Sequence, residues 1–291
     1  MISSASAKFD ERLAFSRSLG WLTEVELKKL STVHVGIIGM GGVGGQYAEI
    51  LARLGVGKFT ICDPDRFAIE NTNRQNECKV SNYDRSKVEV IDELIRDINP
   101  SAQVKIIPGA LKSSDVPLFC SGIDMYLDAL DFFEIDLRLE IFREMRRVGK
   151  PAVTVAPIGM GAACLAFTKD SMSFDAYFGL HESTDPVERS FKFLTGLAPS
   201  LQQRHYVQES DRVDFKNRKT PSLPIGVYAC AAVTATMVVK LMLGRGKVRV
   251  APWSTHYDAY LMRIATKYVP FGYRNPLQRL KVFVARKMYE Q

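Results

Sequence analysis

The residues in this chain best suited to chemistry are a glycine-rich turn and the polar side chains that follow it. The turn, Gly39 to Gly44, has the spacing Gly-x-Gly-Gly-x-Gly. Because glycine has no Cβ, the backbone N–H groups of such a turn and of the helix after it can closely approach a phosphate chain. NAD, FAD and ATP all carry such phosphates, so the turn alone predicts a nucleotide site without choosing among them. The glycines expected to face the phosphates are Gly39, Gly41, Gly42 and Gly44.

The polar residues downstream of the turn favour a triphosphate. Asp63 ends the next predicted strand, where a carboxylate can accept hydrogen bonds from ribose hydroxyls. Arg74 can bind phosphate oxygens with its planar guanidinium, Lys87 supplies a point charge, and Asn71 can donate a further hydrogen bond. Asp131, in a loop after a later strand, can hold the Mg²⁺ that bridges phosphates. A dehydrogenase has no need of such a group beside its ribose-binding strand.

The predicted secondary structure brings these residues to one edge of a sheet. A buried strand at 33–38 runs into the glycine turn, and a helix at 43–54 and a strand at 58–62 complete a β-α-β unit. Strands and helices continue to alternate: strands at 104–107, 125–128, 152–156 and 162–167, and helices at 86–99 and 134–148. This alternation predicts an α/β fold, a doubly wound, Rossmann-like and mostly parallel sheet with helices on both faces. Ligands of such sheets bind at the carboxyl ends of the strands, where all the polar residues fall.

We expect the chain to divide into five segments. These are an N-terminal helical segment (1–32), a Rossmann-like ATP-binding core (33–168), an irregular substrate or crossover region (169–224), a C-terminal helix with strands that complete the fold (225–269) and a basic tail (270–291). Within the fourth segment we expect a helix at 226–243 and strands near 247–250 and 257–266. The basic tail is expected to be a docked amphipathic terminus rather than a membrane-surface or partner-binding helix.

The composition excludes several classes of protein. The five cysteines are odd in number and never spaced as CxxC, which predicts no disulfide framework, no zinc site and a reducing cytoplasmic location. The N-terminus lacks the apolar stretch of a secretion signal. The longest apolar run, Ile225 to Val239, is shorter than the roughly 20 residues of a membrane span and is interpreted as a buried core helix. The net charge of +7 suits phosphate binding, and nucleic acid is not the favoured partner.

Taken in order, these motifs resemble the ThiF/MoeB/ubiquitin-activating superfamily. Its pattern GxGGxG, DxD, NxxRQ, K and D recurs here at matching spacing, and the apolar stretch from Pro224 to Gly244 is similar to its late helix. The second acid of the DxD motif, Asp65, joins the expected nucleotide site. The resemblance implies adenylation of a carboxylate with ATP and Mg²⁺ and release of pyrophosphate. The carboxylate in this family is usually the C-terminal Gly-Gly of a ubiquitin-like protein; a sulfur-carrier protein, a peptide or a small molecule also fits.

The resemblance also implies roles for individual residues. Asp63 would bind ribose, Arg74 and Lys87 the phosphates, and Asp131 the magnesium ion. Arg17 lies where the family keeps an N-terminal arginine that reaches the ATP of a neighbouring subunit. If that role is shared, the active form is a symmetric homodimer with composite sites.

Some features depart from the family pattern. Asp131 is followed by Phe132-Phe133, where the family usually has a small polar residue. There is no cysteine between Cys164 and Cys230, where thioester-forming members keep theirs, so we expect adenylation without a thioester step. The aromatic residues at 172–178 are expected in the core or at a specialised substrate site. Two alternatives remain open: a nicotinamide- or flavin-dependent oxidoreductase, and a nucleotide-binding partner protein without turnover.

Overall fold

The computed structural model describes residues 8–209 and 212–289. Its N-terminal segment holds α1 (Glu11–Ala14), the 3-10 helix η1 (Ser16–Ser18) and α2 (Glu24–Leu30). The helical segment is broken near Gly20, where the backbone takes a positive φ of 99°. A capping box starts α2, because Thr23 and Glu26 each accept from the other's backbone N–H.

The centre of the fold is one eight-stranded sheet with the order β3-β2-β1-β4-β5-β6-β7-β8. The strands are β1 (His34–Ile38), β2 (Lys58–Cys62), β3 (Gln103–Ile107), β4 (Met125–Asp128), β5 (Ala152–Ile158), β6 (Gly161–Phe167), β7 (Trp253–Asp258) and β8 (Arg263–Tyr268). The first five pair in parallel, and β6, β7 and β8 pair antiparallel. The α/β fold with a mostly parallel sheet is therefore confirmed.

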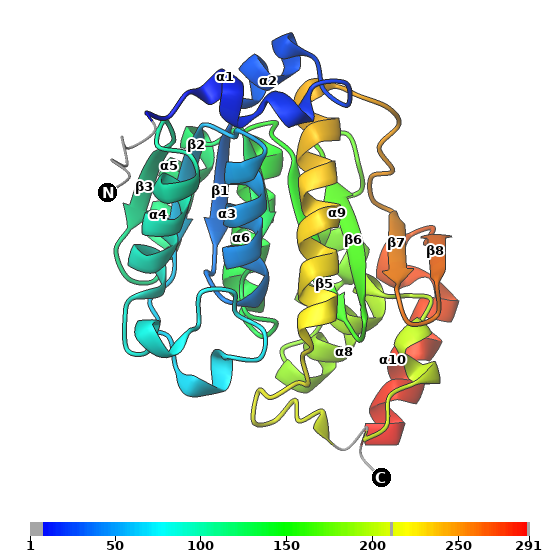
Figure 1. The fold of residues 1–291 in the computed structure, drawn as a ribbon. Helices are drawn as coiled ribbons and strands as arrows, with labels where there is room; N and C mark the ends of the chain where they lie inside the picture. The colour runs from blue at the N-terminus through cyan, green and yellow to red at the C-terminus, as the bar shows by residue number, and fades with distance from the viewer. Residues whose placement is uncertain (1–7, 210–211, 290–291) are drawn as a thin grey trace.

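Helices cover both faces of this sheet (Figure 1). One face carries α3 (Gly42–Arg53), α4 (Lys87–Ile98) and α9 (Pro224–Leu243), and the other carries α5 (Val116–Gly122), α6 (Ile135–Arg147), α7 (Phe174–Phe178) and α8 (Pro186–Leu197). The last helix, α10 (Pro276–Tyr289), packs on α8. Short 3-10 helices fill the connections: η2 (Ile69–Asn71), η3 (Val80–Asn82), η4 (Ser113–Asp115), η5 (Leu180–Glu182), η6 (Gln202–His205) and η8 (Gly272–Arg274).

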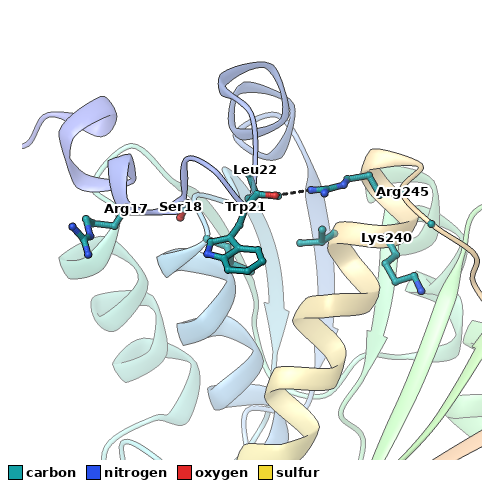
Figure 2. A pocket seen from close by; sticks show the side chains of 9 residues that line it. Arg17, Ser18, Trp21, Leu22, Lys240 and Arg245 are labelled. Atoms are coloured by element: carbon teal, nitrogen blue, oxygen red, sulfur yellow. Dashed lines mark hydrogen bonds between the residues drawn. The ribbon is translucent and has the colours of Figure 1, made fainter.

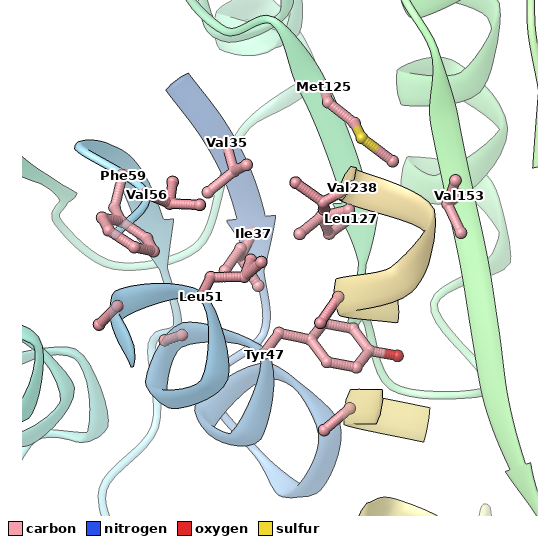
Figure 3. Packing of buried hydrophobic residues seen from close by; sticks show 14 of the residues in the cluster. Val35, Ile37, Tyr47, Leu51, Val56, Phe59, Met125, Leu127, Val153 and Val238 are labelled. Atoms are coloured by element: carbon pink, nitrogen blue, oxygen red, sulfur yellow. The ribbon is translucent and has the colours of Figure 1, made fainter. Parts of the chain in front are cut away.

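A hydrophobic core holds α3 and α9 against the sheet (Figure 3). Val35 and Ile37 of β1 and Leu127 of β4 meet Leu51 of α3, and all four are fully buried. Tyr47 spans this core and satisfies its buried hydroxyl by donating to the carbonyl of Val155 at 2.8 Å. Burying apolar surface of this extent fixes the strand–turn–helix geometry from which the glycine turn projects.

The structure corrects three expectations about the C-terminal half. The segment 169–224, expected to be irregular, contains α7 and α8. The stretch 247–250 is not a strand, and 257–266 is not one strand but the hairpin of β7 and β8 around the turn at 259–262. In contrast, the expectation that the aromatic residues at 172–178 lie in the core is confirmed for those of α7: Phe174, for example, stacks on Phe142 with ring centroids 4.2 Å apart.

The apolar helix α9 is longer than the sequence pattern indicated. It has 20 residues, and by length and composition it is apolar enough to cross a membrane, a test that core helices also pass. Its inner stripe, which includes Cys230 and Val238, is buried against α3, β5 and β6. In this fold α9 is therefore the core helix that was expected, although only part of its surface is covered.

Candidate functional site

The glycine turn lies at the carboxyl end of β1. Gly39 has a φ of +95°, and a Cβ there would lie 2.2 Å from the carbonyl oxygen of Ala129. A Cβ on Gly44 would lie 1.8 Å from the carbonyl oxygen of Gly39. Gly41 is the N-cap residue of α3, and no side chain caps this helix. The first N–H groups of α3, which have no acceptor within the helix, are therefore available to an anion.

Asp63 connects the glycine turn to the end of β2. Its two carboxylate oxygens accept from the backbone N–H groups of Met40 at 2.6 Å and Asp65 at 2.8 Å. Burial raises the pKa of Asp63, and the nearby charge of Lys87 opposes that shift. Asp63 thus holds the turn in place, a role that the sequence did not reveal; ribose binding by this side chain stays a prediction.

Lys87 reaches this edge from the first turn of α4. Its side chain is almost fully buried, and its Nζ lies 3.0 Å from Oδ2 of Asp65. A buried ammonium requires an anionic partner, and Asp65, whose side chain is 65% exposed, is the partner in this structure. Phosphate oxygens could replace or join Asp65 as that partner, since both are anionic acceptors.

Arg74 and its neighbours form the loop beside the N-terminus of α3. A Cβ placed on Gly42 would lie 3.8 Å from Cγ of Arg74, so this arginine borders the turn. Its Nη1 donates to the carbonyl of Glu70 and to the side chain of Asn73, both at 2.9 Å. Asn71 has a local structural role, because its Oδ1 accepts from the N–H of Ala68 at 3.1 Å.

Gln75 belongs to the same loop, and the sequence did not single it out as a site residue. Its Nε2 would lie 3.6 Å from a Cβ on Gly41. Its Oε1 is buried and has no hydrogen-bond partner among the described residues. A buried polar atom without a partner calls for an explanation, and a group donating into the turn from a bound ligand would supply one.

Asp131 follows β4 on the loop that borders the glycine turn. Two thirds of its side chain are exposed, and Oδ1 accepts from the N–H of Phe133 at 3.0 Å. Among the residues that the structure describes, no group of three or more His, Cys, Asp or Glu side chains could hold a metal ion. A single exposed carboxylate suits Mg²⁺ that arrives with a nucleotide, because such an ion takes its other ligands from phosphates and water.

A buried ion pair that the sequence did not suggest shapes the Asp131 loop. Nε of Arg138, on α6, donates to Oδ2 of Asp128 at 2.8 Å, and both side chains are at most 3% exposed. The Nη2 of Arg138 also donates to the carbonyls of Leu130 at 2.8 Å and Asp131 at 3.0 Å. One guanidinium therefore holds the end of β4 and the loop together. The signal available in the sequence was an acid that ends a strand, a second acid three residues later, and an arginine in the next helix.

Arg17 lies at the opposite end of the sheet. Helix α9 begins beside the glycine turn, where Val227 would contact a Cβ on Gly42 at 3.3 Å, and it ends near Arg17. From Val227 to Val239 the helix advances 12 residues, which separates the two ends by about 18 Å. Arg17 borders an open cavity of about 630 Å³, together with Trp21 and the end of α9 (Figure 2). The fold brings Asp63, Arg74, Lys87 and Asp131 to one edge but does not bring Arg17 to them within one chain.

Comparison with known proteins agrees with this geometry. The chain is 34% identical over 137 residues to the tRNA threonylcarbamoyladenosine dehydratase of Escherichia coli (strain K12), a match of 47% of this chain and 50% of that protein. It is 28% identical over 141 residues to the sulfur carrier protein ThiS adenylyltransferase of the same strain, which covers 48% and 55% of the two chains. The chain thus spans about half the length of these relatives.

Solved structures resemble this chain over more of its length. The crystal structure of the Escherichia coli dehydratase, TcdA, covers 80% of this chain and 95% of its own, with 25% identity and a TM-score of 0.58. The Escherichia coli MccB structure with ATP covers 88% of this chain and 69% of its own, with 16% identity and a TM-score of 0.64, a likeness of fold alone. The model of the ThiF family matches residues 15–280, so this chain belongs to the ThiF family.

Proposed function

We propose that this chain is an ATP-dependent adenylating enzyme. The observation that carries the proposal is the convergence of Arg74 and Lys87 with the uncapped N-terminus of α3. Two cations and open backbone N–H groups match the charge of a triphosphate. The family match favours ATP over a nicotinamide or flavin cofactor, since relatives are named adenylyltransferases and MccB was solved with ATP.

In the proposed reaction a carboxylate oxygen attacks the α-phosphorus of ATP. A new bond joins that oxygen to the α-phosphorus, and the bond from the α-phosphorus to the bridging oxygen breaks, which releases pyrophosphate. The protein positions the two reactants and stabilises the charge that develops on phosphate oxygens. Arg74 and Lys87 would supply this charge, and Asp131 would hold the Mg²⁺, which screens the phosphates when it is bound.

We further propose that the substrate is a carboxylate on a small protein, a peptide or a small molecule, and that no thioester forms. Relatives support the substrate class by their names: a ThiS adenylyltransferase, and MccB solved with N-formylated MccA. All five cysteines are buried and free, which supports adenylation without a cysteine nucleophile. Burial raises the pKa of Cys164 to about 12, so its thiolate is scarce at neutral pH.

A homodimer is part of the proposal. Arg17 lies too far from the glycine turn of its own chain to serve it, so a phosphate-binding role requires a second subunit. Trp21, beside Arg17, is 86% exposed, which is unusual for a large apolar side chain and supports an intersubunit contact there. Light scattering gives the mass in solution. Mixed Arg17→Ala and Lys87→Ala subunits would regain activity in hybrid dimers if the sites are composite.

The test of the function is ATP–pyrophosphate exchange with a panel of carboxylate acceptors. We expect exchange with the correct acceptor and at least a 100-fold loss in Arg74→Ala and Lys87→Ala, because each removes a charge-assisted contact in the transition state. Exchange that persists in both variants would refute the site assignment. ATP binding without exchange for any acceptor would favour a nucleotide-binding protein without turnover.

A further inference from the structure

Segment 212–222, which leads into α9, lies against the loop that carries Asp131. Phe215 of this segment is buried and packs on Phe132 and Phe133, with ring centroids 6.1 and 6.3 Å apart. These two phenylalanines are the residues that replace the small polar residue expected after Asp131. They form an apolar surface on which segment 212–222 packs. This contact gives a physical reason for two phenylalanines at positions where the family usually has a small polar residue.

Hydrogen bonds also hold the same segment near its start and at its end. The hydroxyl of Tyr289, on α10, accepts from the N–H of Phe215 at 3.1 Å. The carbonyl of Ser222 accepts from Nδ2 of Asn73, the residue before Arg74, at 3.0 Å. Within the segment, Asp214 and Lys219 exchange two backbone hydrogen bonds of 2.8 Å, which close a turn. The backbone of the segment therefore forms a hydrogen-bonded turn and is not extended.

Arg218 lies on this turn and points to the Asp131 loop. Its Nη2 is 3.9 Å from Oδ1 of Asp131 and forms an ion pair with Glu134. Its guanidinium lies over the ring of Phe133, 5.5 Å from the centroid. The side chain is 55% exposed, so it is accessible to a ligand while the backbone beneath it is held. Arg218 is thus a third basic side chain at the edge where Arg74 and Lys87 lie.

The distance from Arg218 to a bound phosphate follows from the coordination of magnesium. Mg²⁺ binds oxygen at about 2.1 Å, so a phosphate oxygen on an ion held by Asp131 lies within about 8 Å of the present position of Nη2. Rotation about the side-chain bonds of an arginine covers such a gap. The planar fork of the guanidinium then matches two phosphate oxygens. Glu134 competes for the same fork until the nucleotide is bound.

We propose that Arg218 is a phosphate-binding residue of this site, which exchanges Glu134 for the β- or γ-phosphate of Mg²⁺-bound ATP. The inference rests on the proposed function, because it requires a triphosphate beside Asp131. It assigns segment 212–222 to nucleotide binding and makes Phe132 and Phe133 the residues that position it. Since Mg²⁺ bridges the β- and γ-phosphates, the contact distinguishes ATP from AMP.

The test compares two nucleotides by titration calorimetry on the full chain with Mg²⁺. AMPCPP carries the β- and γ-phosphates and is not cleaved at the α–β bond, whereas AMP lacks both. We expect Arg218→Ala to weaken AMPCPP binding about 10-fold, the loss typical of one charge-assisted contact, and to leave AMP binding unchanged. Glu134→Gln removes the competing carboxylate and is expected to tighten AMPCPP binding about 3-fold. Arg212→Ala is the matched control, because that arginine begins the same segment and pairs with Glu209, which lies outside it.

The outcomes separate this inference from the proposed function. If the wild-type chain binds AMPCPP and Arg218→Ala binds it equally well, the Arg218 contact is an ordinary surface ion pair and the inference is wrong. Equal weakening by Arg212→Ala would also refute it, because a general loss of positive charge would then explain the effect. If the wild-type chain binds neither nucleotide, the proposed function fails as well. Circular dichroism of each variant establishes that the fold is intact.

Discussion

Replacing Arg138 by methionine tests whether the buried ion pair with Asp128 holds the Asp131 loop. The change keeps a long side chain and a residue that favours helices, but it leaves the carboxylate of Asp128 buried without its cation. It also leaves the carbonyls of Leu130 and Asp131 without their donor. Removing one partner of a buried ion pair costs about 3–5 kcal/mol of unfolding free energy.

That cost translates into a measurable shift of the melting temperature. Unfolding entropy is about 2.1 cal/mol/K per residue, so a chain of 291 residues has about 0.6 kcal/mol/K. We therefore expect Arg138→Met to melt about 5–8 °C below the wild type. Arg147→Met is the matched control on the same helix, because Arg147 pairs with Glu144 while 68% exposed. Exposed ion pairs contribute little to the free energy of unfolding, so Arg147→Met should melt within about 1 °C of the wild type.

The assay is thermal unfolding followed by circular dichroism at low and high salt. The buried pair is shielded from counterions, so the difference between Arg138→Met and the wild type should persist in 0.5 M NaCl. The double variant Arg138→Met/Asp128→Asn should lose less unfolding free energy than the two single variants lose together, since each single variant leaves one buried partner uncompensated. A shift for Arg138→Met no larger than that of Arg147→Met would refute the reasoning.

Three further predictions concern the turn, a buried histidine and the cysteines. Gly44→Ala should abolish AMPCPP binding and lower the melting temperature, because its Cβ would lie 1.8 Å from the carbonyl oxygen of Gly39. Gly41→Ala should fold normally, because its Cβ meets no atom nearer than 3.6 Å; equal melting temperatures of the two variants would contradict this. Burial lowers the pKa of His256 below its ordinary value of 6.5, so the unfolded chain takes up the proton first and the unfolding free energy should fall as the pH drops below about 6.5. Urea titrations at several pH values should show a smaller slope in His256→Gln than in the wild type, with the rest supplied by His34, whose pKa burial also lowers; an unchanged slope would contradict this. Burial raises the pKa of Cys120 to about 12 and all five cysteines are buried, so the native chain should react with a thiol reagent far more slowly than the unfolded chain; one rapidly reacting thiol would contradict the proposal of adenylation without a thioester.

Local patterns determined the N-terminal half of the fold. The strand at 34–38, the glycine turn and the helix after it are specified by residues close in sequence, and each has a distinct hydrophobic pattern. Because parallel strands end at the same edge, the sequence also predicted that Asp63 and Asp131 would approach the turn. The register of Ile38 with Cys62 and Asp128 produces this arrangement.

The C-terminal half was predicted less well because its signals are weak. The turn between β7 and β8 has no glycine or proline, and Met262 takes a positive φ of 48° instead. Because the sequence carries no turn signal there, its pattern predicts one strand where the structure has a hairpin. The helices α7 and α8 lie in a polar stretch, and their aromatic residues become core only when packed against α6.

By itself, then, the sequence determined a β-α-β nucleotide unit and the residue types at its edge. The tertiary structure alone decided which distant side chains join that edge. Arg138 reaches Asp128 from the next helix, and Arg218 lies 84 residues from the Glu134 that it pairs with. Such contacts depend on how the sheet and its helices pack, and no local pattern records them. The same packing placed Arg17 at the far end of α9, which makes its predicted role depend on a second subunit.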